Sequence, residues 1–364
     1  MKDSIMKIVL VAGARPNFMK IAPLMDAIKN HPYIHPVLVH TGQHYDEKMS
    51  GLFFHELGIP RPDVNLEVGS GSHAVQTAEV MMRFEPVLLD HKPDYVLVVG
   101  DVNSTIACGL VAVKLGVGLI HVEAGLRSFD RTMPEEINRI LTDGISDLLF
   151  CSEQSGVDNL LKEGVPKEKI HLVGNVMIDT LLRHRNKAEK SNILNDLRLR
   201  EKKYAVATLH RPANVDDSET LARIIFTLQI IGKDTPVVFP IHPRTMQRMR
   251  SWDINADPDR IKFIDPLGYL DFLKLVGSAG VVLTDSGGIQ EETTILNVPC
   301  LTLRENTERP CTIEVGSNQL VGTDPEKIMA AYLVARHGKG KSGEIPPLWD
   351  GCAAKRIVSV LDNL

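Results

Sequence analysis

Short runs of aliphatic and β-branched residues recur along the chain, and helical stretches separate them. The runs are apolar at consecutive positions, a pattern typical of strands that are buried on both faces of a parallel sheet. Because a helical stretch follows almost every run, the pattern predicts repeated βα units. The predicted strands are 5–12, 34–40, 95–99, 117–122, 148–151, 204–209, 237–241, 261–264, 281–284 and 299–303.

The alternation pauses between about residues 173 and 203, where Lys, Arg, Asn and Asp are frequent, and then starts again. We therefore expect an α/β protein with two doubly wound, Rossmann-like domains, residues 1–172 and 173–350, that face a cleft. The length of 364 residues fits two such domains. In this class, ligands bind beyond the carboxyl ends of the strands.

Composition narrows the function. The formal charge of −5 comes without a Lys/Arg run, which disfavours nucleic acid as the main ligand. The apolar run near the N-terminus is too short for a signal peptide or a membrane span, so a cytoplasmic protein with no membrane partner is expected. Five well-separated cysteines without a CxxC pair indicate reduced thiols, and no metal site is predicted.

Polar side chains follow the predicted strands at the positions where a parallel sheet binds ligands. After the first strand, GARPNFMK offers Arg15, whose guanidinium suits phosphate or carboxylate oxygens, and Lys20 about one helical turn later. After the third strand, GDVNST offers Asp101. Two alternatives stay open: the basic residues lie in an ordinary solvated turn, and Asp101 belongs to a helix N-cap.

The segment HVEAGLRSFDRTMPEEINR after the fourth strand is rich in acids. Glu123 ends a buried strand, where a carboxylate is costly unless it is paired or used. Glu135 and Glu136 follow Pro134 at the start of a helix, and acids are favoured in a first turn without any further role. The pattern favours Glu123 as a functional group and leaves the glutamate pair open between function and helix stabilisation.

The segment TLHRPANVD in the second half places His210 and Arg211 just after a strand. A single histidine is more often a structural hydrogen-bonding group than a catalytic one. Its position at a strand end beside an arginine shifts the interpretation towards function.

The segment VVLTDSGGIQEE joins a buried strand to a helix. Ser286, Gly287 and Gly288 would present backbone N–H groups at the helix N-terminus, which favours an anion. Glu292 lies about one turn further on, where its carboxylate suits the two hydroxyls of a ribose. Together they predict a site for a nucleoside diphosphate. The alternative, a capped helix with acids such as Glu291 in its first turns, leaves the glycine pair unexplained.

Ten motifs occur in one order between residues 6 and 322: GARPNFMK, TGQHYD, GD, HVEAGLRS, PEEINR, GN…ID, HRPANVD, HP, LTDSGGIQEE and ENTERP. Their order and spacing resemble those of the non-hydrolysing UDP-N-acetylglucosamine 2-epimerases. HVEAGLRS together with DSGGIQEE and TERP is not generic to enzymes of nucleotide sugars, so the resemblance is specific.

The resemblance implies a GT-B-type architecture, with a C-terminal helix at about residues 351–364 packed back on the first domain and UDP bound mainly to the second. It implies Phe272 near the uracil, Arg309 on the nucleotide side, and Arg15 and Lys20 facing the cleft. The residues that it assigns to the substrate are Arg15, Lys20, Phe272, Ser286, Gly287, Gly288, Glu292 and Arg309; those that it assigns to catalysis are Asp101, Glu123, Glu135 and His210.

The activity that the resemblance implies is inversion at C2 of the sugar without a cofactor. UDP leaves C1 as the C2 proton is removed, giving 2-acetamidoglucal, and UDP then adds back as a proton arrives on the other face of C2. Carboxylates would stabilise charge at C1, and His210 would assist the leaving diphosphate. Which carboxylate serves which face stays open. The product, UDP-N-acetylmannosamine, would feed bacterial cell-surface polysaccharide synthesis.

The resemblance also implies a homodimer and a second site at which the UDP-sugar substrate acts as an activator. Open alternatives are a UDP-2,3-diacetamido-sugar 2-epimerase, a hydrolysing epimerase, a GT-B glycosyltransferase and a nucleotide-sugar sensor without turnover. The residues that correspond to the lining of the activator site are Gln43, His44, Glu136, Arg211 and His242.

Overall fold

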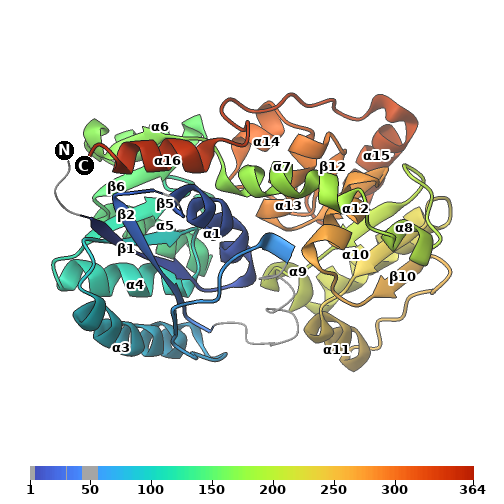
Figure 1. The fold of residues 1–364 in the computed structure, drawn as a ribbon. Coiled ribbons are helices and arrows are strands. Elements are labelled where there is room, and N and C mark those ends of the chain that lie inside the picture. The colour runs from blue at the N-terminus through green and yellow to red at the C-terminus, as the bar shows by residue number, and fades with distance from the viewer. Residues whose placement is uncertain (1–4, 30, 43–55) are drawn as a thin grey trace. The chain divides into compact units, whose positions relative to one another are not determined.

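The computed structural model describes residues 5–29, 31–42 and 56–364. Contacts divide the chain into two units, Met1–Arg183 with Pro347–Leu364 and His184–Pro346 (Figure 1). The sequence analysis places the boundary at residue 172, whereas the contacts place it at Arg183. The first part of α7 (Val176–Ala188) belongs to the first unit, where Thr180 donates a hydrogen bond to the carbonyl of Met19 at 2.6 Å.

The first unit is a parallel sheet of seven strands in the order β3-β2-β1-β4-β5-β6-β7. Its central strands are aliphatic and buried, as strands covered on both faces require. The strands are β1 (Met6–Ala12), β2 (Ile34–His40), β3 (Val64–Asn65), β4 (Tyr95–Val99), β5 (Gly118–Val122), β6 (Leu148–Cys151) and β7 (Ile170–Leu172). The helices that follow them include α1 (Arg15–Ile28), α3 (His73–His91), α4 (Asn103–Lys114), α5 (Pro134–Ile145) and α6 (Gln154–Lys162).

The second unit repeats this topology with six strands in the order β10-β9-β8-β11-β12-β13. The strands are β8 (Ala205–Thr208), β9 (Val237–Pro240), β10 (Ile261–Ile264), β11 (Val281–Thr284), β12 (Cys300–Thr302) and β13 (Asn318–Leu320). The helices include α9 (Pro212–Val215), α10 (Ser218–Gly232), α11 (Pro243–Ser251), α12 (Tyr269–Gly277), α13 (Gly287–Leu296), α14 (Pro310–Glu314) and α15 (Pro325–Val334).

Each sheet reverses its strand order once, between β1 and β4 in the first unit and between β8 and β11 in the second. Loops that leave the carboxyl ends of two such neighbouring strands turn to opposite faces of the sheet and leave a crevice between them. The fold therefore marks two places for functional side chains. One lies at the loops after β1 and β4, and the other at the loops after β8 and β11.

The C-terminal segment Pro347–Leu364 belongs to the first unit. Helix α16 (Ala353–Leu361) packs against α1, and the two lie together in Figure 1. The carboxylate of Asp179 accepts hydrogen bonds from the backbone N–H groups of Ala353 and Ala354 at 3.1 and 2.8 Å. The buried indole of Trp349 donates to the carbonyl of Ser152 at 2.9 Å. These contacts fix the chain end to the first sheet.

The five cysteines are all free, and Cys108, Cys151 and Cys300 are buried. Within the described ranges, every helix is too short or too polar to cross a membrane.

Candidate functional site

The switch point of the first unit is organised by Asn17 at the start of α1. Its side-chain oxygen accepts from the backbone N–H groups of Gly13 and Ala14 at 3.2 and 2.8 Å. Its amide donates to the carbonyl of Val99, the last residue of β4, at 3.1 Å. This one side chain ties the loop after β1 to the end of β4. Asn17 stands inside GARPNFMK, but spacing alone does not identify its long-range partner.

Beside this switch point, Lys20 of α1 and Glu123, which follows β5, form a buried ion pair. Glu123 has a backbone φ of 74°, in the left-handed region that a non-glycine residue adopts at a cost. Gly100 lies beside the pair with a φ of 68°, and a Cβ there would come within 2.8 Å of the Lys20 ammonium. The structure therefore supplies the partner that a carboxylate at this strand end requires.

A buried triad connects the two loops that carry Asp101 and Glu123. The imidazole of His121 contacts Asp143 through Nδ1 at 2.6 Å and the carbonyl of Gly100 through Nε2 at 2.8 Å. Asp143 also pairs with Arg127 at 2.7 Å. Burial acts to raise the pKa of Asp143, but the positive charges of His121 and Arg127 and their hydrogen bonds outweigh it and hold the pKa below its ordinary value. The sequence analysis missed this triad.

Asp101 binds Arg139, a residue of α5. The guanidinium donates to one carboxylate oxygen of Asp101 at 2.8 and 3.1 Å. The N-cap of α4 is Val102, so the alternative in which Asp101 caps that helix is wrong. Asp101 instead faces a cation from the element that carries Glu135 and Glu136.

Glu136 and Glu135 differ in surroundings although they are neighbours. Glu136 is buried, accepts from the backbone N–H groups of Ser128 and Phe129 at 2.9 Å, and pairs with Arg139 at 2.5 Å. It therefore holds the loop that follows Glu123. Glu135 lies half-buried in the first turn of α5. Of the other expected residues, Gln43 and His44 lie outside the described part of the chain, and Arg15 is described only as the first residue of α1.

The switch point of the second unit brings His210 and Asp285 together. Thr208 and Thr284 are paired residues at the ends of β8 and β11, so the two loops start side by side. Asp285 is fully buried and contacts Nδ1 of His210 at 2.8 Å. It also accepts from the backbone N–H of Arg211 at 3.0 Å. Burial acts to raise the pKa of Asp285, but the charge of His210 and these hydrogen bonds outweigh it and lower the pKa.

Helix α13 begins at this switch point behind Ser286, which makes no side-chain capping hydrogen bond. The helix N-terminus is thus available to attract an anion. Gly287 fits here for a packing reason, because a Cβ would lie 2.4 Å from a guanidinium nitrogen of Arg309. Glu291 pairs with the same guanidinium at 2.6 Å. That acid next to the glycines is therefore neutralised within the protein.

Glu308 is the centre of a cluster of arginines beside this helix. Its carboxylate contacts Arg211 at 3.3 Å, Arg304 at 2.9 Å and Arg309 at 2.5 Å. All four side chains are buried or nearly so, which makes their pairing necessary. Of this cluster, the sequence analysis named Arg211 and Arg309 as site residues and missed Glu308 and Arg304.

Glu292 and Phe272 lie on the part of the second unit where α12 meets α13. Glu292 is buried and interacts with the hydroxyl of Tyr269. Burial, followed by the charge and hydrogen bond of Glu292, raises the pKa of Tyr269. Phe272 packs against the apolar cluster that includes Ile289. The structure adds Tyr269 to the residues that the sequence indicated.

His242 is the N-cap of α11 and accepts from the backbone N–H of Arg244 at 3.2 Å. Partial burial, then the charges of Arg244 and His210, lower the pKa of His242. The two histidines are thus close enough to interact electrostatically.

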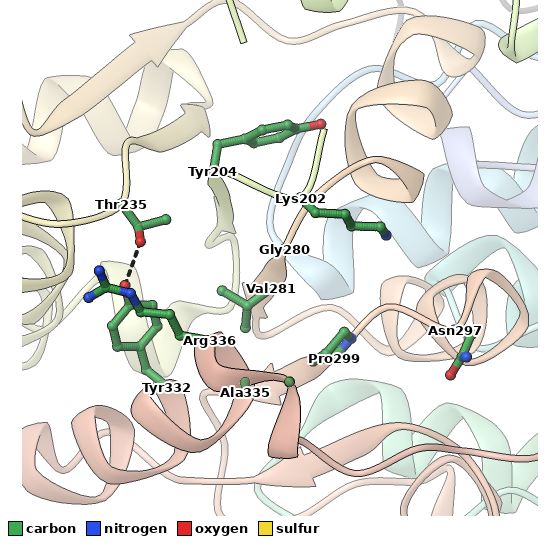
Figure 2. Close-up of a pocket in the computed structure, with 11 residues that line it drawn as sticks. Lys202, Tyr204, Thr235, Gly280, Val281, Asn297, Pro299, Tyr332, Ala335 and Arg336 are labelled. Atoms are coloured by element: carbon green, nitrogen blue, oxygen red, sulfur yellow. Dashed lines mark hydrogen bonds between the residues drawn. The ribbon is translucent and has the colours of Figure 1, made fainter. Parts of the chain in front are cut away.

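A pocket of about 300 Å³ lies elsewhere on the second unit (Figure 2). Tyr204, Val281 and Pro299 line it, and they stand at the amino ends of β8, β11 and β12. Figure 2 also shows the hydrogen bond between Thr235 and Tyr332 at its edge. The pocket therefore opens at the edge of the sheet opposite to the polar loops and is separate from the candidate site.

A family model described as UDP-N-acetylglucosamine 2-epimerase matches residues 26–362. A UDP-N-acetylglucosamine 2-epimerase of Methanococcus maripaludis is 44% identical in an alignment 364 positions long, which covers 98% of each chain. The UDP-2,3-diacetamido-2,3-dideoxy-D-glucuronate 2-epimerase of Pseudomonas aeruginosa is 42% identical and covers 99% of this chain and 100% of that one. The crystal structure of the Methanocaldococcus jannaschii UDP-GlcNAc 2-epimerase in complex with UDP-GlcNAc and UDP has a TM-score of 0.92 at 44% identity, covering 99% of this chain and 100% of that one.

The paired parallel sheets have the GT-B-type architecture expected from the sequence, with acids and cations at both switch points. That combination defines an α/β enzyme of the kind that handles nucleotide sugars. The chain belongs to the UDP-N-acetylglucosamine 2-epimerase family, a family of isomerases.

Proposed function

We propose that the protein interconverts UDP-N-acetylglucosamine and UDP-N-acetylmannosamine by inverting C2 of the sugar. The observation that carries the proposal is the buried pair of Glu123 and Lys20 beside the switch point of the first unit, in a chain of this epimerase family. A carboxylate kept at a strand end in a strained backbone conformation is suited to acid–base chemistry or to stabilising a cationic sugar.

The second unit would hold UDP. The N-terminus of α13 offers backbone N–H groups to the diphosphate at Ser286, Gly287 and Gly288. Glu292 would accept hydrogen bonds from the ribose hydroxyls, with Tyr269 fixing its carboxylate. Phe272 would contact the uracil. Arg309 would act indirectly, since its guanidinium neutralises Glu291 and Glu308 beneath the helix terminus.

The reaction would proceed by elimination and re-addition. The C1–O bond breaks with both electrons leaving on UDP, a base takes the C2 proton, and a double bond forms between C1 and C2. In the second half, UDP oxygen attacks C1 and a proton is delivered to the opposite face of C2. No group is oxidised or reduced, so the balance needs no external reagent.

Asp101, Glu123 and Glu135 of the first unit would serve this chemistry. Two titratable groups are needed, one for each face of C2, and the third carboxylate would stabilise positive charge at C1. Lys20 and Arg139 pair with Glu123 and Asp101 and supply their counter-charges. Arg15 would add positive charge for the substrate phosphates.

His210 would donate a hydrogen bond to the diphosphate as it leaves. Its side chain is 55% exposed although Asp285 beneath it is fully buried, so the ring is anchored on one side and accessible on the other. A donor of this kind becomes more effective as negative charge develops on the leaving oxygen.

A second candidate substrate is a UDP-2,3-diacetamido sugar acid. The observation that favours it is the similarity to the Pseudomonas aeruginosa enzyme, 42% identical over nearly the whole chain. The mechanism at C1 and C2 would be the same, because the additional groups lie at other carbons. In either case the epimerised sugar would be a precursor of cell-surface polysaccharide.

A second binding position for the substrate and a homodimeric assembly are further parts of the proposal. Arg211 and His242 would contribute to the second position, and Glu136 would contribute by holding the Ser128–Phe129 backbone. Sigmoidal dependence of rate on UDP-N-acetylglucosamine would support it, whereas hyperbolic kinetics in both directions would remove it. Sedimentation of the purified protein tests the dimer.

Product analysis tests the proposed function. Purified protein is incubated with UDP-N-acetylglucosamine without NAD or metal, and the mixture is resolved by anion exchange and proton NMR. UDP-N-acetylmannosamine in equilibrium with substrate is the expected result. Free UDP with N-acetylmannosamine would indicate a hydrolysing enzyme instead. No change with this substrate, but turnover of the diacetamido sugar acid, would favour the second candidate, and no turnover of either would contradict the proposal.

A further inference from the structure

The geometry points to Asp285 as a positioning residue that fixes the tautomer and orientation of the His210 imidazole and supplies its counter-charge. This inference rests on the role proposed above for His210 at the leaving diphosphate. Asp285 itself is fully buried and acts only through the histidine.

The two carboxylate oxygens of Asp285 have different tasks. Oδ1 contacts Nδ1 of His210 at 2.8 Å and shares the backbone N–H of the same residue, at 3.1 Å, with the other oxygen. Oδ2 accepts from the backbone N–H groups of His210 and Arg211 at 3.1 and 3.0 Å and from the side-chain amide of Asn214 at 3.1 Å. An acceptor facing Nδ1 requires that Nδ1 carries a proton, so Nε2 is the nitrogen that faces a ligand. Nε2 donates to a diphosphate when the ring carries both protons.

The charges around the ring agree with this assignment. Arg211 is the next residue, and His242 at the start of α11 interacts with His210, with Arg244 and Asp216 paired beyond it at 2.6 Å. Asp285 is therefore an acid in direct contact with the His210 imidazole, and the nearby charged groups include cations. A protonated ring that holds a diphosphate would depend on this carboxylate for its neutralisation.

The substitution Asp285→Asn would reverse the contact. The amide oxygen would take the place of Oδ2, where N–H donors converge, and the amide nitrogen would then face Nδ1. A neutral ring would have to accept there, so its proton would move to Nε2. The diphosphate would lose a charged donor and keep at most a neutral one, which is a weaker partner.

The test combines nitrogen NMR with kinetics. Protein labelled with ¹⁵N-histidine, with His210 identified by comparison with His210→Gln, should show a protonated Nδ1 at neutral pH. Asp285→Asn should show an unprotonated Nδ1, and its kcat should fall by about 10- to 100-fold with KM changed by less than about threefold. A bare Nδ1 in the unsubstituted protein, or an unchanged tautomer in the variant, would overturn the inference.

A matched control and a double variant separate positioning from support of the loop. Asn214→Ala removes one donor to the same carboxylate but leaves the contact to the ring, so it should keep the tautomer. In a His210→Gln background, Asp285→Asn should lower kcat little further, whereas a purely structural role would lower it by the same factor as before.

The spectrum of the unsubstituted protein decides the tautomer even if Asp285→Asn is unstable. Because the spectrum is recorded without turnover, it also tests the inference about Asp285 separately from the proposed epimerase function. A protonated Nδ1 in a protein that does not epimerise the substrate would contradict the proposed function alone. Epimerase activity with a bare Nδ1 would contradict the inference alone.

Discussion

Lys20 and Glu123 form an ion pair in which the two side chains are 7% and 5% exposed. Lys20 comes from α1, which follows β1, and Glu123 comes directly after β5. The pair therefore joins these two elements beside Gly100, the residue after β4. Burial of both charges makes each depend on the other. Substitution of either residue should therefore affect both the turnover of the protein and the stability of the first unit.

Glu123→Gln should lower turnover by a factor of about 10² to 10⁴, the range for loss of a positioned acid or base. It should also destabilise the protein by about 3–5 kcal/mol, because Lys20 is left buried without its counter-charge. Affinity for UDP should be unchanged, since the nucleotide is assigned to the second unit. Steady-state kinetics, thermal unfolding and UDP titration give the three values.

The double substitution Lys20→Met with Glu123→Gln separates these effects. It should recover much of the stability, because an apolar side chain replaces the isolated charge. It should not recover turnover. The matched control is Glu85→Gln at an exposed position of α3, which should change neither stability nor turnover. Normal turnover in Glu123→Gln would remove Glu123 from the mechanism.

Gly287→Ala should weaken UDP binding and lower the melting temperature. The added Cβ would lie 2.4 Å from a nitrogen of the buried Arg309 guanidinium, which is held by Glu291 and Glu308. Displacement of this cluster would shift the start of α13. Calorimetric titration with UDP and thermal unfolding measure both effects.

Gly144→Ala is the control for that substitution, because a Cβ at this helical glycine meets nothing within 4 Å. It should raise stability by about 0.4–1 kcal/mol, through the smaller entropy of the unfolded chain. Equal UDP affinity and stability in Gly287→Ala and the unsubstituted protein would contradict the packing role of Gly287.

Acid sensitivity should depend on Asp143. Its pKa is lowered in the folded protein, so it contributes stability that is fully present above the unfolded pKa of about 3.9 and is lost as pH falls towards the folded value. Asp143→Asn should thus be less stable at pH 7, and the difference from the unsubstituted protein should shrink below about pH 4. Urea unfolding at several pH values measures this difference in stability, and Asp158→Asn at an exposed position is the control. A difference that is constant from pH 7 to pH 3 would count against this account.

The C-terminal segment should be essential to the first unit. Trp349 is 1% exposed and donates to Ser152, so Trp349→Ala should cost about 3–5 kcal/mol. Removal of Leu364, which is 52% exposed, should have little effect. Thermal unfolding compares the two. Equal melting temperatures would show that the chain end contributes little to the first unit.

The central strands could be predicted from the sequence because their burial on both faces leaves a continuous apolar run. Residues 34–40, 95–99, 148–151, 261–264 and 281–284 are strands with the predicted bounds. The analysis missed β3, β7 and β13, which have two or three residues each and lie at the edges of the sheets. A strand so short has no periodicity, and an edge position needs less apolar character.

The candidate residues could be located because they follow strands, but their partners could not. Asp285 and His210 are 75 positions apart in sequence, and only the pairing of β8 with β11 brings them together. Arg139 reaches Asp101 across 38 positions of the chain. A local sequence pattern shows which side chains follow a strand. It does not show the order of the strands in the sheet, and these pairs depend on that order.

Solvent exchange at C2 shows whether the sugar loses its C2 proton during the reaction. UDP-N-acetylglucosamine is incubated in D₂O with the protein, with Glu123→Gln and with Glu85→Gln, and C2 is followed by proton NMR. We expect the unsubstituted protein and the surface control to form UDP-N-acetylmannosamine that carries deuterium at C2. Glu123→Gln should form the same product at a rate at least about 10²-fold lower. Epimerised product that keeps the original C2 hydrogen would contradict proton abstraction into solvent, and no epimerised product would contradict the proposed reaction itself.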